Sequence, residues 1–272
     1  MSEMTDAELR EFVASQEWYH TIELRPGVVT PGWFDTRLVS AKLPWPSLVG
    51  KRCLDVGTFD GFWALEMERK SAAEVRAIDV LDPKQWDWPA IHAADVVEAI
   101  GERKRAGGGF ELVVEELKSK VQRMELSVYD LDPSVMGLFD FAYVGSLLLH
   151  LRDPISALMR VREVLEPGGQ LILVDAIDWE LTLRHPRSPT ARLDGDGRPW
   201  WWRPNRMGLQ RMVESAGFQV VDGPHVFAMP RGPGRARVRP SLRALKGAIA
   251  RQEAIEGSIG DPHAWLVAVT PH

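Results

Sequence analysis

The fold is decided by the stretch Lys51-Arg-Cys-Leu-Asp-Val-Gly-Thr-Phe-Asp-Gly61. Its first half is an apolar strand that delivers Asp55 at its carboxyl end, and Gly57 and Gly61 allow a tight turn into the following helix. Ligands of doubly wound sheets bind at such strand ends, where the backbone must approach them closely. The loop lacks the G-x-G-x-x-G pattern of a dinucleotide site and opens with a carboxylate, which would repel a pyrophosphate.

Strands and helices alternate outward from this stretch. Short apolar strands are predicted at 52–56, 74–80, 124–129, 139–144, 170–176, 218–221 and 265–270. Helices are predicted at 6–17, 62–69, 110–121, 154–165 and 205–216, and helical spacing predicts another at 241–256. This alternation predicts an α/β fold with a mainly parallel sheet and helices on both of its faces.

A Gly- and Pro-punctuated segment, 18–46, separates the first helix from this alternation. The first helix has a capping-box pattern formed by Thr5 and Glu8. The segment after it cannot be one regular element, because turn residues interrupt it repeatedly. We therefore expect residues 1–50 to form a lid over a domain at 51–272, with inserts at about 179–204 and about 231–262.

The bulk composition is that of an ordinary globular protein. Apolar residues make up 45% and charged residues 26%, and the formal net charge of −5 excludes a generally basic nucleic-acid-binding protein. The single cysteine, Cys53, excludes an internal disulfide and predicts a buried, inert thiol in a reducing cytoplasm. No stretch reaches the about 20 apolar residues that cross a membrane. Residues 1–10 are polar and acidic, unlike a signal peptide.

Asp79 ends the second predicted strand and supplies a second acidic strand end. An acidic residue about 20 residues beyond such a loop accepts hydrogen bonds from two ribose hydroxyls. The alternative is a solvated turn residue. The joint occurrence of Asp55 and Asp79 favours the ribose role, and S-adenosylmethionine, with its ammonium and sulfonium groups, suits an acidic loop.

Three later segments accompany the loop: Ser127-Val-Tyr-Asp130, Phe139-Asp-Phe-Ala-Tyr-Val-Gly-Ser146 and Val164-Leu-Glu-Pro-Gly-Gly-Gln-Leu-Ile-Leu173. Together they resemble the class I S-adenosylmethionine-dependent methyltransferases over about residues 50–178. The resemblance implies an enzyme with a Rossmann-like, doubly wound, mainly parallel seven-stranded sheet and S-adenosyl-L-methionine as its cofactor. The sequence departs from the family's acidic-x-Gly-x-Gly-x-Gly loop at Phe59, which replaces the middle glycine, and at Asp60.

The resemblance places the cofactor residues at the ends of the parallel strands. Asp130 is expected near the adenine amino group with Tyr129 beside it, and the exit of the strand 139–144 is expected at the methionine end. Trp33 is expected to cover the cofactor or the substrate. The predicted cofactor-binding residues are Asp55, Gly57, Thr58, Gly61, Asp79, Tyr129, Asp130, Gly145, Ser146 and Trp33.

A narrower resemblance lies in Trp18-Tyr-His-Thr-Ile-Glu-Leu24, Thr30-Pro-Gly-Trp-Phe-Asp35 and Ser146-Leu-Leu-Leu-His-Leu-Arg-Asp-Pro154. This combination resembles the branch that includes the tRNA wobble-uridine carboxymethyltransferases, whose members carry such an N-terminal lid. The tRNA enzymes have lysine- and arginine-rich lids that hold a carboxylated cofactor. Here the lid has Arg25 and Arg37 amid apolar residues, so the resemblance implies the lid rather than the substrate.

Two histidines are candidate general bases that would take a proton from the acceptor. His150 follows the strand 139–144, and an imidazole with an unperturbed pKa of about 6.5 suits proton transfer near neutral pH. The alternative is that His150 packs on the next helix beside Asp153. His20 in the lid either lines the pocket or satisfies backbone carbonyls. Because positioning alone supplies up to about 7–11 kcal/mol, a base is optional.

Pro199-Trp-Trp-Trp-Arg-Pro-Asn205 stands out even in a chain with eleven tryptophans. Three consecutive tryptophans cannot all face one side of a strand or helix, so at least one points into a pocket or an interface. The candidate substrate residues for an aromatic or planar acceptor are therefore Trp201, Trp202 and Arg203, together with Tyr19. The alternative is a hydrophobic plug between the insert and the core.

These features predict methyl transfer to a small-molecule acceptor, with secondary metabolism as the context. One alternative is a tRNA-modifying enzyme that uses the basic stretch from Arg231 to Arg251. Another is a non-catalytic cofactor-binding protein on the same fold. No spacing of histidines, cysteines and carboxylates predicts a metal site. The oligomeric state and the acceptor atom are not encoded in any recognisable pattern.

Overall fold

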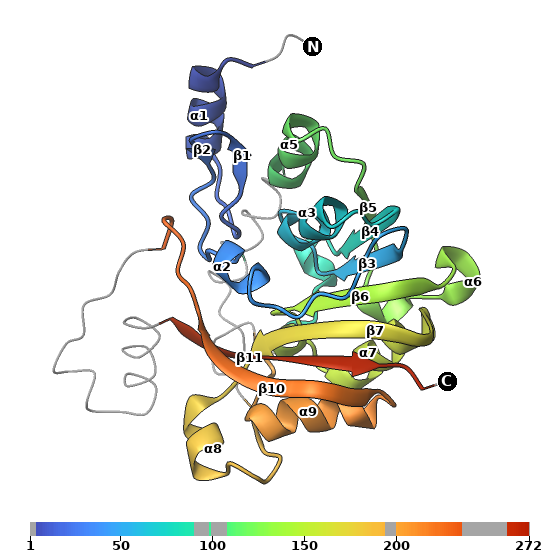
Figure 1. The fold of residues 1–272 in the computed structure, drawn as a ribbon. Helices are drawn as coiled ribbons and strands as arrows, with labels where there is room; N and C mark the ends of the chain where they lie inside the picture. The colour runs from blue at the N-terminus through green and yellow to red at the C-terminus, as the bar shows by residue number, and fades with distance from the viewer. Residues whose placement is uncertain (1–3, 90–97, 99–107, 194–199, 236–259, 272) are drawn as a thin grey trace, which may run out of the picture.

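A seven-stranded sheet forms the centre of the protein in a computed structural model, with the strand order β10-β11-β7-β6-β3-β4-β5 (Figure 1). The structure describes residues 4–89, 98, 108–193, 200–235 and 260–271. The strands of the central sheet are β3 (Arg52–Val56), β4 (Glu74–Asp79), β5 (Gln122–Glu125), β6 (Phe139–Gly145), β7 (Leu165–Ala176), β10 (Gln219–Met229) and β11 (Asp261–Val269).

Five of these strands are parallel, which confirms the predicted Rossmann-like, mainly parallel sheet. β3 pairs in parallel with β4 and β6, β4 with β5, and β6 with β7. β11 runs antiparallel to both β7 and β10. The first residues of β11 therefore lie at the same sheet edge as the carboxyl ends of the parallel strands, and His263 pairs with Ala176 at the end of β7.

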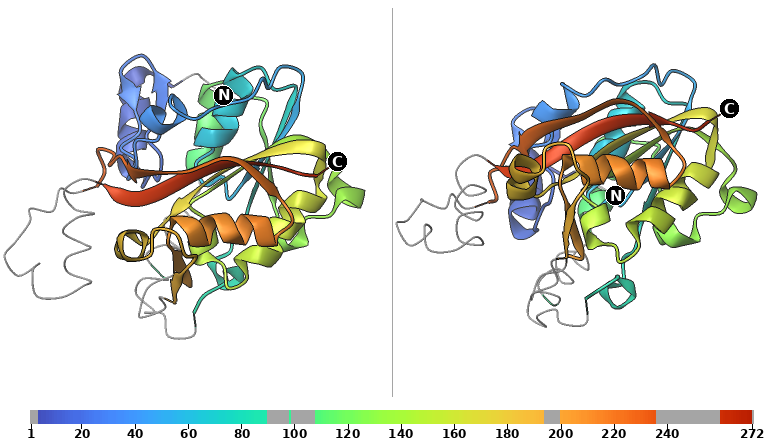
Figure 2. Two further views of the ribbon diagram at one scale, coloured as in Figure 1. Left: turned by 60° about the horizontal axis from the view of Figure 1, so that its bottom comes forward. Right: turned by 90° about the horizontal axis from the view of Figure 1, so that it is seen from below.

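Helices cover both faces of the sheet, as Figure 2 shows. The alternation of side chains along each strand divides the core: Phe141 and Tyr143 of β6 face the cluster under α3 and α5, whereas Ala142 and Val144 face the cluster under α7 and α9. The helices that cover the sheet are α3 (Phe62–Arg69), α5 (Gly108–Glu116), α7 (Pro154–Glu163) and α9 (Arg206–Ser215). A short α6 (Pro133–Met136) precedes β6.

The N-terminal segment, residues 4–50, packs on the α3 face above the carboxyl ends of the parallel strands (Figure 1). The predicted capping box is confirmed, because Thr5 N–H donates to Glu8 Oε2 at 2.8 Å and Glu8 N–H donates to Thr5 Oγ1 at 3.3 Å. Isolated bridges join Phe34 to His20 and to Arg231. The elements of the segment are α1 (Asp6–Ser15), β1 (Glu23–Arg25), β2 (Val28–Val29) and α2 (Arg37–Ser40).

The strands β7, β10 and β11 are longer than the sequence indicated, and β11 begins at Asp261 rather than at residue 265. β7 begins at Leu165 rather than at residue 170, because Thr270 N–H donates to the Gly169 carbonyl and the Thr270 hydroxyl donates to the Glu166 carbonyl. The turn predicted at 166–169 is therefore an irregularity inside the strand, where the pairing with β6 shifts register. β10 spans Gln219–Met229 rather than 218–221, since its polar residues pair with β11.

Several remaining elements differ only at their ends. The predicted strand 124–129 is divided into β5 and the 3₁₀ helix η2 (Val128–Asp130). The predicted insert 179–204 contains α8 (Trp179–Arg184), β8 (Ala191–Leu193) and β9 (Trp202–Pro204). The helix predicted at 241–256 lies outside the described residues. Within the described part of the chain, no helix has the length and apolar character needed to cross a membrane.

Candidate functional site

The loop after β3 turns through three residues with left-handed backbone. Gly57 (φ +77°), Phe59 (φ +51°) and Gly61 (φ +87°) bring the chain from the strand into α3 within five residues. Glycine adopts this conformation without a steric penalty, whereas for Phe59 it costs about 1–2 kcal/mol. That strain places the Phe59 ring 5.1 Å from the ring of Tyr19, over the opening of the loop.

Asp55 holds this loop from beneath. Its Oδ2 accepts hydrogen bonds from Thr58 Oγ1 at 2.7 Å and from Ala64 N–H at 3.1 Å, so it joins β3 to the first turn of α3. Burial raises the pKa of Asp55 to about 7, and the two hydrogen bonds oppose that rise. Thr58 is fully buried, and its hydroxyl orients Asp55.

Asp79 stands at the end of β4, beside this loop. One carboxylate oxygen accepts from Phe59 N–H at 3.0 Å, and the other accepts from Val80 N–H at 2.9 Å. The side chain is therefore fixed in orientation at the neighbouring strand end. The two acidic residues, predicted from the sequence to act together, lie on the neighbouring strands β3 and β4, where Asp55 pairs with Ala77, two residues before Asp79.

A cavity of about 610 Å³ opens at this edge of the sheet, within the ~300–1,000 Å³ usual for small-molecule sites. Its floor is the carboxyl ends of β3, β4 and β6, with Asp55, Gly57, Asp79 and Gly145. Its cover is the N-terminal segment, from which Trp18, Tyr19, His20, Trp33 and Phe34 contribute. Loops after β4, β5 and β6 and the first residues of β11 close its sides.

Most of the predicted site residues lie on this cavity, and a minority do not. The predicted residues on its lining are Asp55, Gly57, Asp79, Tyr129, Gly145, Ser146, Trp33, Tyr19, His20, His150 and Arg203. Thr58 and Gly61 support the loop, with Gly61 as the N-cap of α3. Asp130, expected at the adenine, is exposed and lies outside the lining. Trp201 and Trp202 also lie outside it.

Sequence reasoning missed a group of cavity residues on two segments. Trp86, Asp87 and Trp88 follow the 3₁₀ helix η1 (Pro83–Gln85), and the two indole rings stack at 5.1 Å. Asp261 and His263 come from the start of β11. The Trp86-Asp87-Trp88 stretch follows Asp79 closely in the sequence and could have been predicted to line the site. The residues of β11 could not, because they reach the site only through the antiparallel direction of that strand.

A second buried carboxyl group lies beneath the cavity, in addition to Asp55. Asp175, at the end of β7, is 1% exposed and accepts from Leu147 N–H at 2.9 Å and Leu148 N–H at 2.8 Å. Burial raises its pKa to about 6. Between Asp175 and Asp55, the buried hydroxyl of Tyr143 has no hydrogen-bond partner among the described residues. A dry carboxylate pair with an unsatisfied hydroxyl suits a cationic, hydrogen-bonding ligand group.

Tyr143 also explains the glycine that follows it. A Cβ on Gly145 would lie 2.5 Å from Tyr143 Cε1 and 2.8 Å from its hydroxyl, too close for any side chain. The Tyr143 ring stacks on Trp63 of α3 at 4.2 Å, which fixes the phenol in this position. Gly145 is thus required by the packing of its neighbour at the exit of β6.

The two histidines predicted as bases occupy different environments. His20 is 3% exposed, stacks on Phe62 at 5.7 Å, and burial lowers its pKa to about 3. His150 ends the 3₁₀ helix η3 (Leu148–His150) and is half-buried on the cavity wall. Both line the cavity, and His20 is neutral at physiological pH.

Asp60, the second departure from the family loop, fastens the N-terminal segment to the domain. Its Oδ2 accepts from Tyr19 N–H at 2.6 Å and from His20 N–H at 2.9 Å. The carboxylate is buried, so these charge-assisted bonds are stronger than neutral ones. The position of Tyr19 over the cavity therefore depends on a side chain that follows Phe59 in the same loop.

The tryptophan cluster joins the insert to the loops around the cavity. Trp201 Nε1–H donates to the Asp87 carbonyl and Trp202 Nε1–H donates to the Arg152 carbonyl at 3.0 Å. Arg203 is buried and stands 5.3 Å over the ring of Trp200. Trp200 and Arg203 line the cavity. Trp201 and Trp202 instead hold the neighbouring loops through their indole N–H groups.

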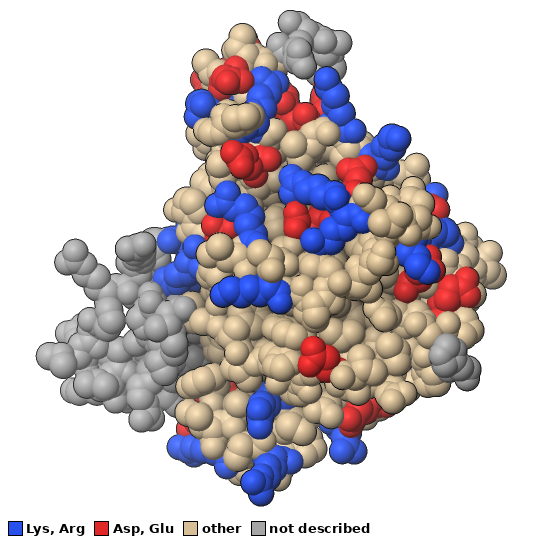
Figure 3. Space-filling view, in the orientation of Figure 1, with Lys and Arg blue, Asp and Glu red and all other residues tan. Residues whose placement is uncertain are grey.

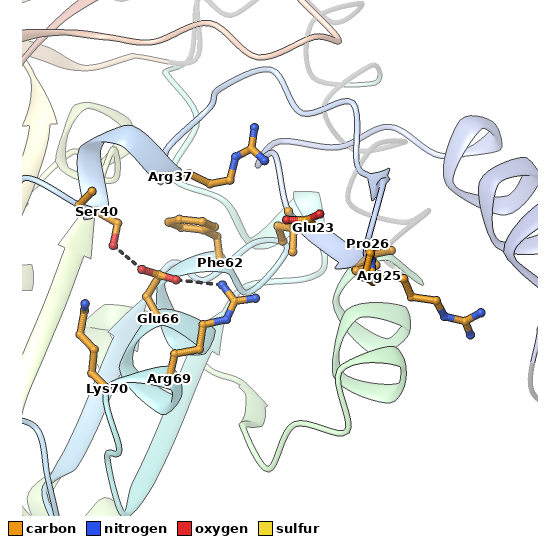
Figure 4. A pocket seen from close by; sticks show the side chains of 12 residues that line it. Glu23, Arg25, Pro26, Arg37, Ser40, Phe62, Glu66, Arg69 and Lys70 are labelled. Carbon is orange, nitrogen blue, oxygen red and sulfur yellow. Dashed lines mark hydrogen bonds and ion pairs between the residues drawn. The ribbon is translucent and has the colours of Figure 1, made fainter.

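A second, open pocket of about 630 Å³ lies between the N-terminal segment and α3 (Figure 4). Its basic side chains already have partners: Arg69 pairs with Glu66, Arg37 with Asp35, and Arg25 with Asp6 and Glu116. Figure 4 shows Glu66 between Ser40 and Arg69. Its arginines are therefore paired with carboxylates, whereas Lys70 lies over the ring of Trp45.

The geometry at the strand ends fits a nucleoside with a cationic side chain beside a second, planar molecule. No group of three or more metal-ligating side chains occurs among the residues that the structure describes. Cys53 is buried, and burial raises its pKa to about 12, as expected of an inert thiol. The described lining of the site offers carboxylates, hydroxyls, imidazoles and aromatic rings.

The sequence is similar to a known family and to several characterised proteins. A family model described as "Methyltransferase domain" matches residues 36–222. A tRNA U34 carboxymethyltransferase of Ectopseudomonas mendocina is 27% identical over 191 residues, covering 65% of this chain and 48% of that protein. Methyltransferase str3 of Strobilurus tenacellus is 27% identical over 147 residues, covering 54% and 41%. The chain spans about half the length of the curated relatives it matches.

Solved structures share the fold at lower identity. The 1,6-didemethyltoxoflavin-N1-methyltransferase of Burkholderia thailandensis, solved with 1,6-didemethyltoxoflavin and S-adenosylhomocysteine, aligns with a TM-score of 0.51 at 15% identity over 92% of this chain and 78% of that chain. The YcgJ protein of Bacillus subtilis aligns with a TM-score of 0.52 at 14% identity, over 87% of this chain and 97% of that chain.

Proposed function

The chain belongs to the methyltransferase-domain family, and from this premise we propose that it transfers a methyl group from S-adenosylmethionine to a small, planar acceptor held in the cavity at the strand ends. The observation that carries the proposal is the cavity itself. Its floor has the two acidic strand ends, Asp55 and Asp79, and its cover is aromatic.

The residues on the floor fit S-adenosylmethionine. Asp79 would accept the ribose hydroxyls, and the stacked Trp86 and Trp88 would give the adenine an apolar wall. The buried, unpartnered hydroxyl of Tyr143 between Asp55 and Asp175 suits the methionine ammonium group. When bound, the cofactor would supply an electrophilic methyl carbon on a cationic sulfur.

The cover supports a planar acceptor of modest size. Trp33 and Phe34 of the N-terminal segment face the cavity, and Trp200 and Arg203 approach it from the insert. Aromatic walls bind flat rings by stacking, and a buried guanidinium adds directed hydrogen bonds. We infer an aromatic or heteroaromatic acceptor with at least one polar group, and secondary metabolism supplies many such molecules.

A tRNA acceptor is the second candidate, because relatives such as that of Ectopseudomonas mendocina carry this activity in their name. Those relatives match only over about half of their length. On the face in Figure 3, acidic and basic side chains alternate over the N-terminal segment and α3, without a continuous basic stripe for a phosphate backbone. The described side chains of this face therefore give no support to a phosphate backbone, and the aromatic lining of the cavity supports the small acceptor.

The test is formation of S-adenosylhomocysteine from S-adenosylmethionine with two kinds of acceptor. One is a panel of phenols, aromatic amines and N-heterocycles, and the other is unmodified tRNA transcript. We expect turnover with a member of the panel and little change in KM with salt. Turnover with tRNA alone, with a KM that rises steeply with salt, would overturn the choice of acceptor. Cofactor binding without turnover in either set would favour a non-catalytic role.

A further inference from the structure

Three polar side chains meet on the wall of the cavity, and each comes from a different part of the chain. They are Tyr19 of the N-terminal segment, Ser146 directly after β6, and His263 near the start of β11. Ser146 Oγ lies 3.2 Å from His263 Nε2. Tyr19 lines the same wall. The Ser146–His263 pair therefore joins the exit of β6 to the start of β11 on the wall of the cavity.

The direction of the Ser146–His263 hydrogen bond follows from the other ring nitrogen. His263 Nδ1 lies 3.0 Å from the backbone carbonyl oxygen of Asp261. A carbonyl oxygen only accepts, so Nδ1 carries the proton and, in a neutral ring, Nε2 is an acceptor. The Ser146 hydroxyl must therefore donate to Nε2. Its oxygen in turn can accept a proton from a molecule in the cavity.

His263 is held in the form that can receive a proton. It is 4% exposed, and burial lowers its pKa, so the ring is neutral at physiological pH. The charged groups that act on it are Asp261, Arg203 and Arg235, and Arg235 Nη1 donates to Asp261 Oδ2 at 2.6 Å. The Asp261 contact fixes the tautomer, as a second residue does for imidazoles that take part in proton transfer.

The backbone at Ser146 is strained in a way that positions its hydroxyl. Ser146 has φ +50°, a left-handed conformation that costs a non-glycine residue about 1–2 kcal/mol. It is retained because Ser146 N–H donates to the Val174 carbonyl at 2.8 Å, while the next two N–H groups donate to Asp175. Unfavourable backbone conformations that are maintained by surrounding hydrogen bonds in this way occur mainly at functional sites.

We propose that Ser146 and His263 form a proton relay that deprotonates the hydroxyl or amine of the acceptor during methyl transfer, an inference that rests on the proposed function. A lone pair of the acceptor atom forms the bond to the methyl carbon as the carbon–sulfur bond breaks and returns its electron pair to sulfur. The acceptor proton passes to Ser146 Oγ, and the Ser146 proton passes to His263 Nε2. Charge balances, since the positive charge leaves sulfur and appears on the imidazolium.

Ser146 is the group that touches the acceptor, and His263 acts through it. Tyr19 covers the relay from above, with its ring among those of His20, Phe34 and Phe59. Near this chain of groups, the buried Oδ1 of Asp261 has no partner among the described residues. That oxygen would accept a hydrogen bond from a second polar group of the acceptor.

The first arm of the test needs no acceptor. Protein labelled with ¹⁵N-histidine and saturated with S-adenosylhomocysteine is studied by NMR, with the His263 signals assigned through His263→Gln. We expect the proton on Nδ1, and an Nε2 resonance that moves toward that of an unbonded neutral ring in Ser146→Ala. A proton on Nε2, a charged ring at neutral pH, or an Nε2 resonance unaffected by Ser146→Ala would overturn the relay.

The second arm uses the acceptor found in the panel. His263→Gln should lower kcat by roughly 10²–10⁴-fold while the KM for S-adenosylmethionine is unchanged. The double variant Ser146→Ala/His263→Gln should be no slower than the slower single variant, because the two residues act as one unit. His225→Gln, an exposed histidine on the neighbouring β10, is the matched control and should leave kcat unchanged.

Independent effects that multiply in the double variant would overturn the relay, as would unchanged kcat in His263→Gln. Calorimetric titration of every variant with S-adenosylhomocysteine separates this failure from that of the proposed function. If the relay alone is wrong, the variants still bind the product. If the proposed function is wrong, the unmodified protein either does not bind the product or binds it without turning over any acceptor of the panel.

Discussion

Asp79 ends β4 and Asp82 follows three residues later in the next loop, yet of the two only Asp79 lines the cavity. Asp79 is 6% exposed and is oriented by the backbone N–H groups of Phe59 and Val80. Asp82 accepts a hydrogen bond from Lys84 N–H in the turn that follows. Substitution of Asp82 is therefore a control for substitution of Asp79, because Asp82 stabilises the turn but does not line the cavity.

Asp79→Ala should weaken binding of S-adenosylhomocysteine by about 1.5–3 kcal/mol, the contribution of hydrogen bonds to a charged group. Calorimetric titration of the folded variant measures the change. Asp82→Ala should bind the product with the affinity of the unmodified protein. Equal affinities for all three proteins would refute the ribose role of Asp79.

A buried carboxylate at a strand end also makes stability depend on pH. The pKa of Asp175 is raised to about 6 from 3.8, so the folded state binds more protons than the unfolded state between these values. Its contribution to the free energy of unfolding therefore falls as pH rises through this window. The lowered pKa of His20 makes the free energy of unfolding rise with pH instead. The contribution of Asp175 must therefore be measured as the difference between a variant and the unmodified protein.

Asp175→Asn removes the ionisation but keeps an oxygen that can accept from the backbone N–H groups. Relative to the unmodified protein, its free energy of unfolding should increase as pH rises from about 4 to about 7, by up to about 3 kcal/mol. Urea unfolding at several pH values gives the difference. A difference that is constant with pH, or that decreases, would contradict the raised pKa.

At the level of elements, Asp60 of the β3–α3 loop is one of several residues that fasten the N-terminal segment over the cavity, beside the Phe34–Arg231 bridge and the Ser40–Glu66 hydrogen bond. Asp60 accepts two backbone N–H groups of that segment, whereas Asp6 makes an exposed ion pair with Arg25. The β3–α3 loop and the N-terminal segment, which line the same cavity, are therefore coupled through Asp60. This coupling accounts for a departure from the family's loop pattern.

Asp60→Ala should increase the rate of amide hydrogen exchange at Tyr19 and His20, because each loses a charge-assisted hydrogen bond worth about 1.5–3 kcal/mol. Exchange followed by NMR or mass spectrometry measures the change. Asp6→Ala, which removes a surface ion pair of about 0–1 kcal/mol, is the control and should leave these amides protected. Protection that is the same in both variants would show that Asp60 does not hold the segment.

Over the whole molecule, the sequence predicted the sheet and the β3–β4 half of the cavity. Asp55, Gly57 and Asp79 could be found because a strand, a turn and an acidic strand end occur in one continuous stretch or nearby. His263 and Asp261 could not, because their place depends on β11 running antiparallel and starting at the ligand edge. Asp130 lies outside the cavity lining because it ends a 3₁₀ helix, where the sequence predicted the exit of a strand.

The measurement that tests the central claim most directly is calorimetric titration of the purified protein with S-adenosylmethionine, S-adenosylhomocysteine and NAD. We predict that both sulfur compounds bind with micromolar dissociation constants, about −8 kcal/mol, and that NAD does not bind. Binding of NAD alone, or of none of the three, would contradict a cofactor site built from Asp55, Asp79 and Tyr143.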